Sequence, residues 1–186
     1  MQRIVLAVAL SASVASVIQA AEYNQVQAEQ SRIGFSYTQM GVPMDGRFKK
    51  FSGQLSFDPA QPTTAKAAIA VDLASIDTGT PEADTEVAGK QWFNTPAFPT
   101  ARFESVSVKA LGDNRYEVAG TLTIKGKTQT VVVPATFTAQ GTTGLFEGGF
   151  TIRRGDFAIG EGPWSAFDIV ANDIQIKFKL TAKSGS

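Results

Sequence analysis

Side chains that could carry out catalysis or bind a metal are scarce in this sequence of 186 residues, which contains no histidine and no cysteine. A nucleophile activated by a histidine base, a zinc site with thiolate or imidazole ligands, a disulfide and a histidine-ligated haem are therefore excluded. Carboxylates remain, and Asp77, Asp84 and Asp156 are the candidates for acid–base chemistry. We expect no catalytic residue, no metal site and no cofactor.

Two glycine motifs resemble nucleotide-binding loops but do not fit them. Five residues separate Gly120 from Gly126-Lys127-Thr128, whereas a phosphate-binding loop needs four. That stretch also alternates apolar and polar residues, so we predict a hairpin there. Gly160-Glu161-Gly162 lacks the third glycine and the following helix of a dinucleotide-binding site.

The charged residues form no convincing site either. Asp84 and Glu86 are two positions apart on a predicted helix, where side chains do not face each other, so we interpret them as solvated charges. Arg153 and Arg154 are interpreted as outward strand residues that aid solubility or protect an edge. The 17 basic and 17 acidic side chains balance, which argues against a nucleic-acid partner.

The first 20 residues have the pattern of a secretory signal peptide. A single Arg3 precedes an apolar run that is too short to span a bilayer, and Ala20 is a small residue suited to the cleavage site. We predict cleavage after Ala20, a single mature domain over residues 21–186, and a periplasmic location.

The mature chain alternates apolar and polar residues, which indicates antiparallel strands with one solvated face. About eight such runs are found, at 32–38, 46–57, 67–73, 101–109, 118–125, 130–138, 145–153 and 174–181. The alternation slips between Phe48 and Phe51, which predicts a bulge or bend near Lys50. The sequence therefore predicts an all-β barrel or sandwich.

Two segments interrupt the strand pattern. Thr80 followed by Pro81 and acidic residues predicts the start of a helix, whose segment runs to Asn94. A second, loop-like segment carries Pro163-Trp164. Both place large aromatic residues outside the strands, where a lid or the mouth of a pocket would lie.

Phenylalanine dominates the aromatic residues, with 13 Phe against 3 Tyr and 2 Trp. An eight-stranded barrel is just wide enough to be filled by side chains or to hold one small ligand, and these residues leave both alternatives open. For a ligand, the inward candidates are Phe35, Phe48, Ile69, Val71, Phe103, Leu122, Ile124, Phe150, Ile152, Ile176 and Phe178. Candidates at the helix and loop end are Trp92, Phe93, Phe98, Phe157 and Trp164.

Several segments, in this order and spacing, give the chain its resemblance to the YceI-like, polyisoprenoid-binding family of secreted bacterial proteins. They include residues 31–35, Gly46-Arg47-Phe48, Phe57-Asp58-Pro59, residues 75–79, Trp92-Phe93-Asn94, residues 98–103, 120–126 and 156–160. The resemblance covers Tyr23 to Leu180. Where members of this family often have histidines, this chain has Gln30 and Glu86.

The resemblance implies an extended, lipocalin-like, eight-stranded antiparallel β-barrel with a helix near one end. It also implies a non-enzymatic periplasmic carrier that sequesters an isoprenoid lipid, either a polyprenyl or a quinone-like chain, with transient membrane contact. The oligomeric state, monomer or homodimer, stays open. The alternatives are a carrier of another apolar ligand, such as a fatty acid, and a filled barrel that acts as a stress or interaction protein.

Overall fold

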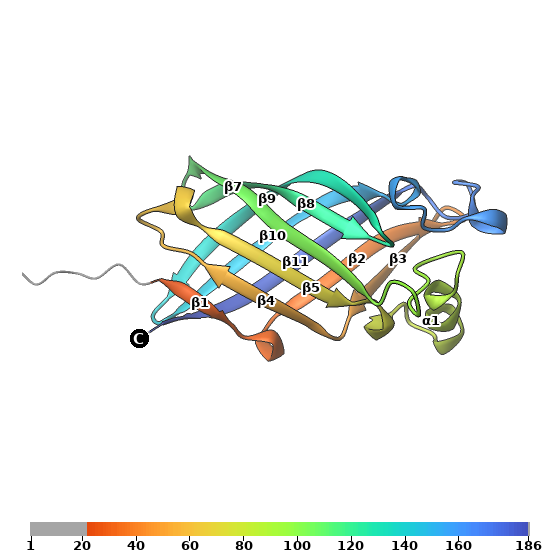
Figure 1. The fold of residues 1–186 in the computed structure, drawn as a ribbon, viewed down its shortest axis with the longest axis horizontal. Helices are drawn as coiled ribbons and strands as arrows, with labels where there is room; N and C mark the ends of the chain where they lie inside the picture. The colour runs from red at the N-terminus through yellow and green to blue at the C-terminus, as the bar shows by residue number, and fades with distance from the viewer. Residues whose placement is uncertain (1–21, 186) are drawn as a thin grey trace, which may run out of the picture.

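The computed structural model describes residues 22–185, so the predicted signal peptide lies outside the described residues. Within this range a single sheet of eleven strands curls into an elongated barrel (Figure 1). In chain order the strands are β1 (Tyr23–Val26), β2 (Arg32–Gln39), β3 (Val42–Phe48), β4 (Phe51–Ser56), β5 (Lys66–Asp72), β6 (Ile76–Asp77), β7 (Thr100–Gly112), β8 (Arg115–Ile124), β9 (Lys127–Gln140), β10 (Thr143–Arg153) and β11 (Asp173–Ser184).

The strand order explains how the sheet closes. It runs β4-β5-β7-β8-β9-β10-β11-β2-β3-β6, and only Lys49 and Lys50 separate β3 from β4. Because β3 pairs with β2 while β4 pairs with β5, this bent run joins the two ends of the sheet. The bend predicted near Lys50 and the antiparallel barrel class are confirmed. The predicted eight strands become eleven because the bend divides one of them and β1 and β6 are short additions.

The hairpin between β8 and β9 turns through Lys125 and Gly126, whose φ angles are 49° and 72°. Two consecutive positive φ angles are typical of a tight two-residue hairpin turn, and glycine adopts such an angle without strain. The stretch from Gly120 to Thr128 is therefore a hairpin, as predicted.

Helix α1 (Pro81–Ala88) begins as the sequence predicts. The Thr80 hydroxyl accepts a hydrogen bond from the Ala83 N–H at 3.3 Å, and Pro81 occupies the first helical position. The helix ends at Ala88, before Gly89, so the prediction that this element runs to Asn94 is wrong beyond that point. Glycine is a poor helix former, and Trp92 and Phe93 lie in the turns that follow.

Five single-turn 3-10 helices occur in the connections: η1 (Ala28–Gln30), η2 (Pro62–Thr64), η3 (Leu73–Ser75), η4 (Arg154–Phe157) and η5 (Gly162–Trp164). No helix within residues 22–185 is long and apolar enough to cross a membrane.

The two ends of the barrel differ. Near β1, a cluster of rings packs edge to face: Phe57 lies 5.3 Å from Tyr116 and 5.1 Å from Phe146 between centroids. Helix α1 and the segment of residues 154–171, called the rim loop below, lie at the opposite end (Figure 1).

Candidate functional site

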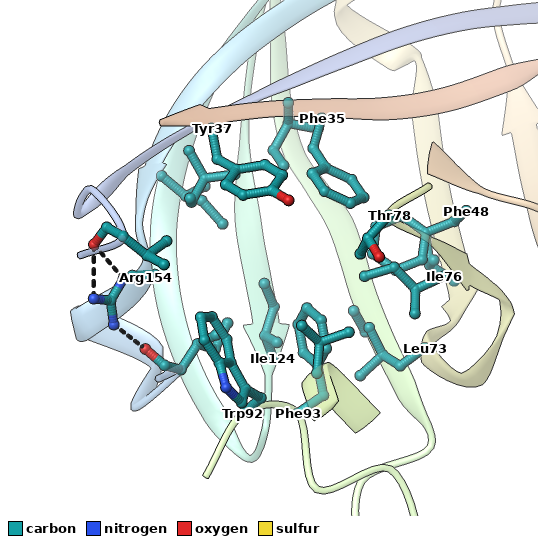
Figure 2. Close-up of a pocket in the computed structure, with 18 of the residues that line it drawn as sticks. Phe35, Tyr37, Phe48, Leu73, Ile76, Thr78, Trp92, Phe93, Ile124 and Arg154 are labelled. Carbon is teal, nitrogen blue, oxygen red and sulfur yellow. Dashed lines mark hydrogen bonds between the residues drawn. The ribbon is translucent and has the colours of Figure 1, made fainter. Parts of the chain in front are cut away.

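The barrel interior beside α1 and the rim loop holds a cavity of about 400 Å³, called the first cavity, a size typical of small-molecule sites. Figure 2 shows its wall, made of apolar side chains from several strands and from the segment after α1. Of the predicted site residues, the following line it: Phe35, Phe48, Val71, Trp92, Phe93, Leu122, Ile124, Phe150, Ile152, Trp164 and Ile176.

A second cavity of about 180 Å³ adjoins the first. The predicted residues Ile69, Phe103 and Phe178 line this cavity and not the first. The wall includes the aromatic Phe57 and Phe146, so the second cavity extends toward the β1 end. The barrel interior therefore contains unfilled space in two adjacent regions, which leaves room for a ligand.

Two of the predicted site residues, Phe98 and Phe157, line neither cavity. Phe157 is 2% exposed and belongs to the same buried core cluster as Trp92. The Phe98 ring covers the β8–β9 turn, where a Cβ placed on Gly126 would lie 3.0 Å from it. Both rings support the elements around the cavity.

Polar groups gather at the α1 side of the first cavity, where its lining includes Gln39, Thr78, Glu82 and Glu86. The Trp164 indole N–H donates a 2.7 Å hydrogen bond to Glu86 Oε1, which joins the rim loop to α1. Position 86, one of the two where the resemblance departs from the family pattern, therefore lies on the rim of the cavity.

The interpretation of Asp84 and Glu86 as solvated charges holds for Glu86, which is exposed, and is wrong for Asp84, which is half-buried and hydrogen-bonded within the fold. Asp84 Oδ1 accepts hydrogen bonds from the Thr78 N–H and the Thr78 hydroxyl, both at 2.7 Å. Since Glu86 accepts from Trp164, the two carboxylates hold different segments around the mouth of the cavity.

The interpretation of Arg154 as an outward strand residue is also wrong. The side chain is 1% exposed, and the five N–H groups of its guanidinium make seven hydrogen bonds, some of them shared, all to backbone carbonyls of the rim loop. Figure 2 shows part of this network. The shortest, at 2.8 Å, reach the carbonyls of Ile159, Trp164 and Val170. Burial lowers the pKa of Arg154. The period-two alternation that places Ile152 inward also places Arg154 inward, and this signal could have identified it.

A second cation ties the rim loop to the β8–β9 hairpin. Lys125 Nζ donates to the Ala158 carbonyl at 2.6 Å and to Glu161 Oε2 at 2.8 Å, and its side chain is only 8% exposed. The hydrogen bond from Lys125 and its positive charge hold the pKa of Glu161 below its ordinary range.

Two residues that line the first cavity each have a polar group without a hydrogen-bond partner among residues 22–185. The Tyr37 hydroxyl projects into the cavity in Figure 2, and burial raises its pKa. The Trp92 indole N–H is buried and has no hydrogen-bond partner among the described residues. Tyr37 was not among the predicted site residues, although its strand alternation places it inward with Phe35.

Within residues 22–185, no group of three or more acidic side chains is arranged to hold a metal ion. The enzyme candidates do not converge either. Asp77 pairs with Arg47 at 3.1 Å, Asp84 with Thr78, and Asp156 is exposed on η4.

Comparison with known proteins identifies relatives across most of the chain. A family model described as a YceI-like domain matches residues 24–182. A UPF0312 protein of Ectopseudomonas mendocina is 33% identical over 157 residues, covering 80% of this chain and 82% of the relative.

Solved structures share the fold. The crystal structure of Burkholderia cenocepacia BcnA superposes with a TM-score of 0.84 at 43% identity, covering 86% of this chain and 100% of BcnA. A polyisoprenoid binding domain from Saccharophagus degradans, described as implicated in plant cell wall breakdown, has a TM-score of 0.69 at 15% identity, covering 90% of this chain and 100% of that domain.

Proposed function

The chain belongs to the family of proteins with a YceI-like domain, and on that premise we propose that it is a periplasmic carrier that encloses an isoprenoid lipid inside its barrel. The observation that carries the proposal is the pair of apolar cavities, of about 400 and 180 Å³, within one barrel. The description of the Saccharophagus domain as polyisoprenoid-binding supports the choice of ligand class.

The energetics favour a long hydrocarbon. Each methylene group removed from water contributes about 0.8 kcal/mol, so an extended prenyl chain gains more the more of its length the barrel covers. A closed barrel covers the chain on all sides, whereas a surface groove leaves part of it in water. The polar groups at the α1 side favour a ligand whose head group lies there and whose tail points toward the second cavity.

The rim favours a neutral head group, such as a quinone, a phenol or an alcohol. All donors of Arg154 already point to backbone carbonyls, so its guanidinium has none left for a phosphate. Glu82 and Glu86 lie at the mouth and repel an anion. The Tyr37 hydroxyl, which projects into the cavity, is the group that suits a carbonyl or hydroxyl oxygen.

The site supports binding without catalysis. Its walls are apolar, and the carboxylates Asp77 and Asp84 are engaged by Arg47 and by Thr78. We therefore assign the protein no reaction and no cofactor other than the lipid it carries.

The test of the proposal is mass spectrometry of the protein purified natively from the periplasm. We expect a stoichiometric polyprenyl compound in the organic extract and an intact mass that lacks the first 20 residues. A fatty acid in the extract would favour the carrier of another apolar ligand. An empty extract, from cells that contain prenyl lipids, would contradict the carrier function.

A substitution at Ile124 tests the location of the ligand. Ile124 is 6% exposed and lines the first cavity, so Ile124→Trp should fill the space of the ligand and lower lipid occupancy several-fold. The matched control is Thr121→Trp, on the outer face of the same strand, β8, where it pairs with Glu104 and Thr130. Equal lipid content in both variants would contradict the assignment.

A further inference from the structure

Six residues line both cavities and form the boundary between them. They are Ile33, Val71, Ala101, Leu122, Phe150 and Ile176, called the belt below. Each comes from a different strand, namely β2, β5, β7, β8, β10 and β11 in chain order. Since these strands follow one another around the barrel with only β9 between β8 and β10, the belt encircles most of the interior.

The strand pairing places four of the six belt residues in two pairs of direct neighbours. Val71 pairs with Ala101 across β5 and β7, and Phe150 pairs with Ile176 across β10 and β11. Ala101 is buried at 7% exposure and is the smallest side chain of the six. At the boundary between the cavities, position 101 therefore carries only a methyl group.

The two cavities differ in chemistry as well as in size. The acidic and hydroxyl groups of the rim line the first cavity only. The polar residues that line the second cavity are Tyr116, Lys66 and Arg102. Because Lys66 and Arg102 are exposed, their charged groups can lie in water while the aliphatic parts of their side chains line the cavity. A ligand with a head group fits the first cavity, whereas the second suits hydrocarbon.

We propose that the belt sets the chain length that the barrel accepts, with Ala101 as the specificity-determining residue. This inference rests on the proposed function, since it divides one prenyl ligand between the two cavities. A short prenyl chain occupies the first cavity alone. A long chain passes the belt beside Ala101 and gains binding free energy from the second cavity, because each added methylene leaves water.

The test compares two prenyl alcohols on the delipidated protein, farnesol and a polyprenol of about eight isoprene units. Both tryptophans of the chain, Trp92 and Trp164, line the first cavity, so quenching of their fluorescence reports binding. We expect the wild-type protein to bind the polyprenol at least about tenfold more tightly than farnesol.

Ala101→Leu should close the belt. The preference for the polyprenol, which is the ratio of the two Kd values, should fall to about one. Farnesol binding also shows that the variant is folded. The matched control is Ala70→Leu, on the outer face of β5 between Ser52 and Arg102, which should keep the wild-type preference.

A second variant fills the far cavity without touching the belt. Ala67 lines the second cavity only, and Ala67→Phe should remove the preference for the polyprenol in the same way. Equal affinity of wild type for the two alcohols, or an unchanged preference in both variants, would overturn this inference and leave the carrier function standing. Failure of the wild-type protein to bind either alcohol would overturn both.

Discussion

At the scale of single residues, Arg154 is the most unusual feature of the molecule. A buried cation is costly unless it is paired or fully hydrogen-bonded, and this one satisfies its donors with backbone carbonyls. Its guanidinium carbon also lies 4.9 Å from the centre of the Phe167 ring and 5.7 Å from that of Trp92. One side chain thus fixes the path of the rim loop over the cavity.

Arg154→Met should lower the free energy of unfolding by about 3 kcal/mol or more, because it leaves several buried carbonyls without a donor. Arg154→Lys should recover only part of this loss, since a compact ammonium has three donors in place of five. Urea denaturation measures both. The matched control is Arg153→Met, at an exposed residue 4.0 Å from Asp173, which should change stability by no more than about 0.5 kcal/mol. Equal effects at positions 153 and 154 would contradict the role of Arg154.

At the scale of elements, the rim loop is fastened to three parts of the barrel. Its Trp164 donates to Glu86 on α1, and its Glu161 accepts from Lys125 at the tip of the β8–β9 hairpin. At its far end, the Ile169 carbonyl accepts a 2.8 Å hydrogen bond from the Met40 N–H, just after β2. The loop and α1 therefore close the polar end of the barrel together.

The contact between Lys125 and Glu161 predicts an acid-sensitive rim loop. The pKa of Glu161 is lowered from its ordinary 4.5, first by the hydrogen bond from Lys125 and then by its charge. A lowered carboxyl pKa stabilises the folded state fully above 4.5, and this contribution is lost as the pH falls through the lowered pKa. The protection of amide hydrogens in residues 154–171 against exchange, measured relative to the intrinsic exchange rate at each pH, should therefore fall in that acidic range.

Glu161→Gln provides the comparison for this pH dependence, because a neutral amide does not titrate. The variant should show faster exchange in the rim loop already at neutral pH and a weaker response to acid than wild type. An identical acid response in the two proteins would show that another group controls the loop.

At the scale of the whole molecule, the two ends of the barrel differ in how much of the interior is filled. Rings such as Phe57, Phe137 and Tyr23 pack together near β1, beside the smaller cavity, while the larger cavity lies under α1 and the rim loop. A hollow core lacks the contacts that a filled core supplies, so the folded state without ligand is stabilised less than its size would allow.

Removal of the lipid should therefore lower the melting temperature, and adding it back should restore it. A ligand that binds only the folded state, present at a free concentration of about 100 times its Kd, raises the free energy of unfolding by about 2.7 kcal/mol. Calorimetry of the native, delipidated and reloaded protein measures this gain. The Ile124→Trp variant should show a smaller gain, and equal melting temperatures for native and delipidated protein would contradict a ligand inside the barrel.

Local sequence patterns were sufficient to predict much of the secondary structure of this protein. Alternation in one segment reports which residues share a face of a strand, so runs such as Ile174 to Leu180 predicted their strand and its inward side. Turn and capping chemistry is equally local, which is why Lys125-Gly126 and Thr80-Pro81 predicted a hairpin and a helix start. The segments shared with the YceI-like family predicted the antiparallel barrel.

Only the tertiary structure decided what the inward faces enclose. Whether a barrel is filled or hollow depends on distances across it between strands far apart in the sequence, and no local pattern contains those distances. The belt unites six strands, and Phe157 packs behind the wall instead of in it. The burial of Arg154 likewise required the carbonyls of residues 159–171 to turn toward one point. Such convergence is a property of the folded chain, because it is set by packing between segments and not by any one of them.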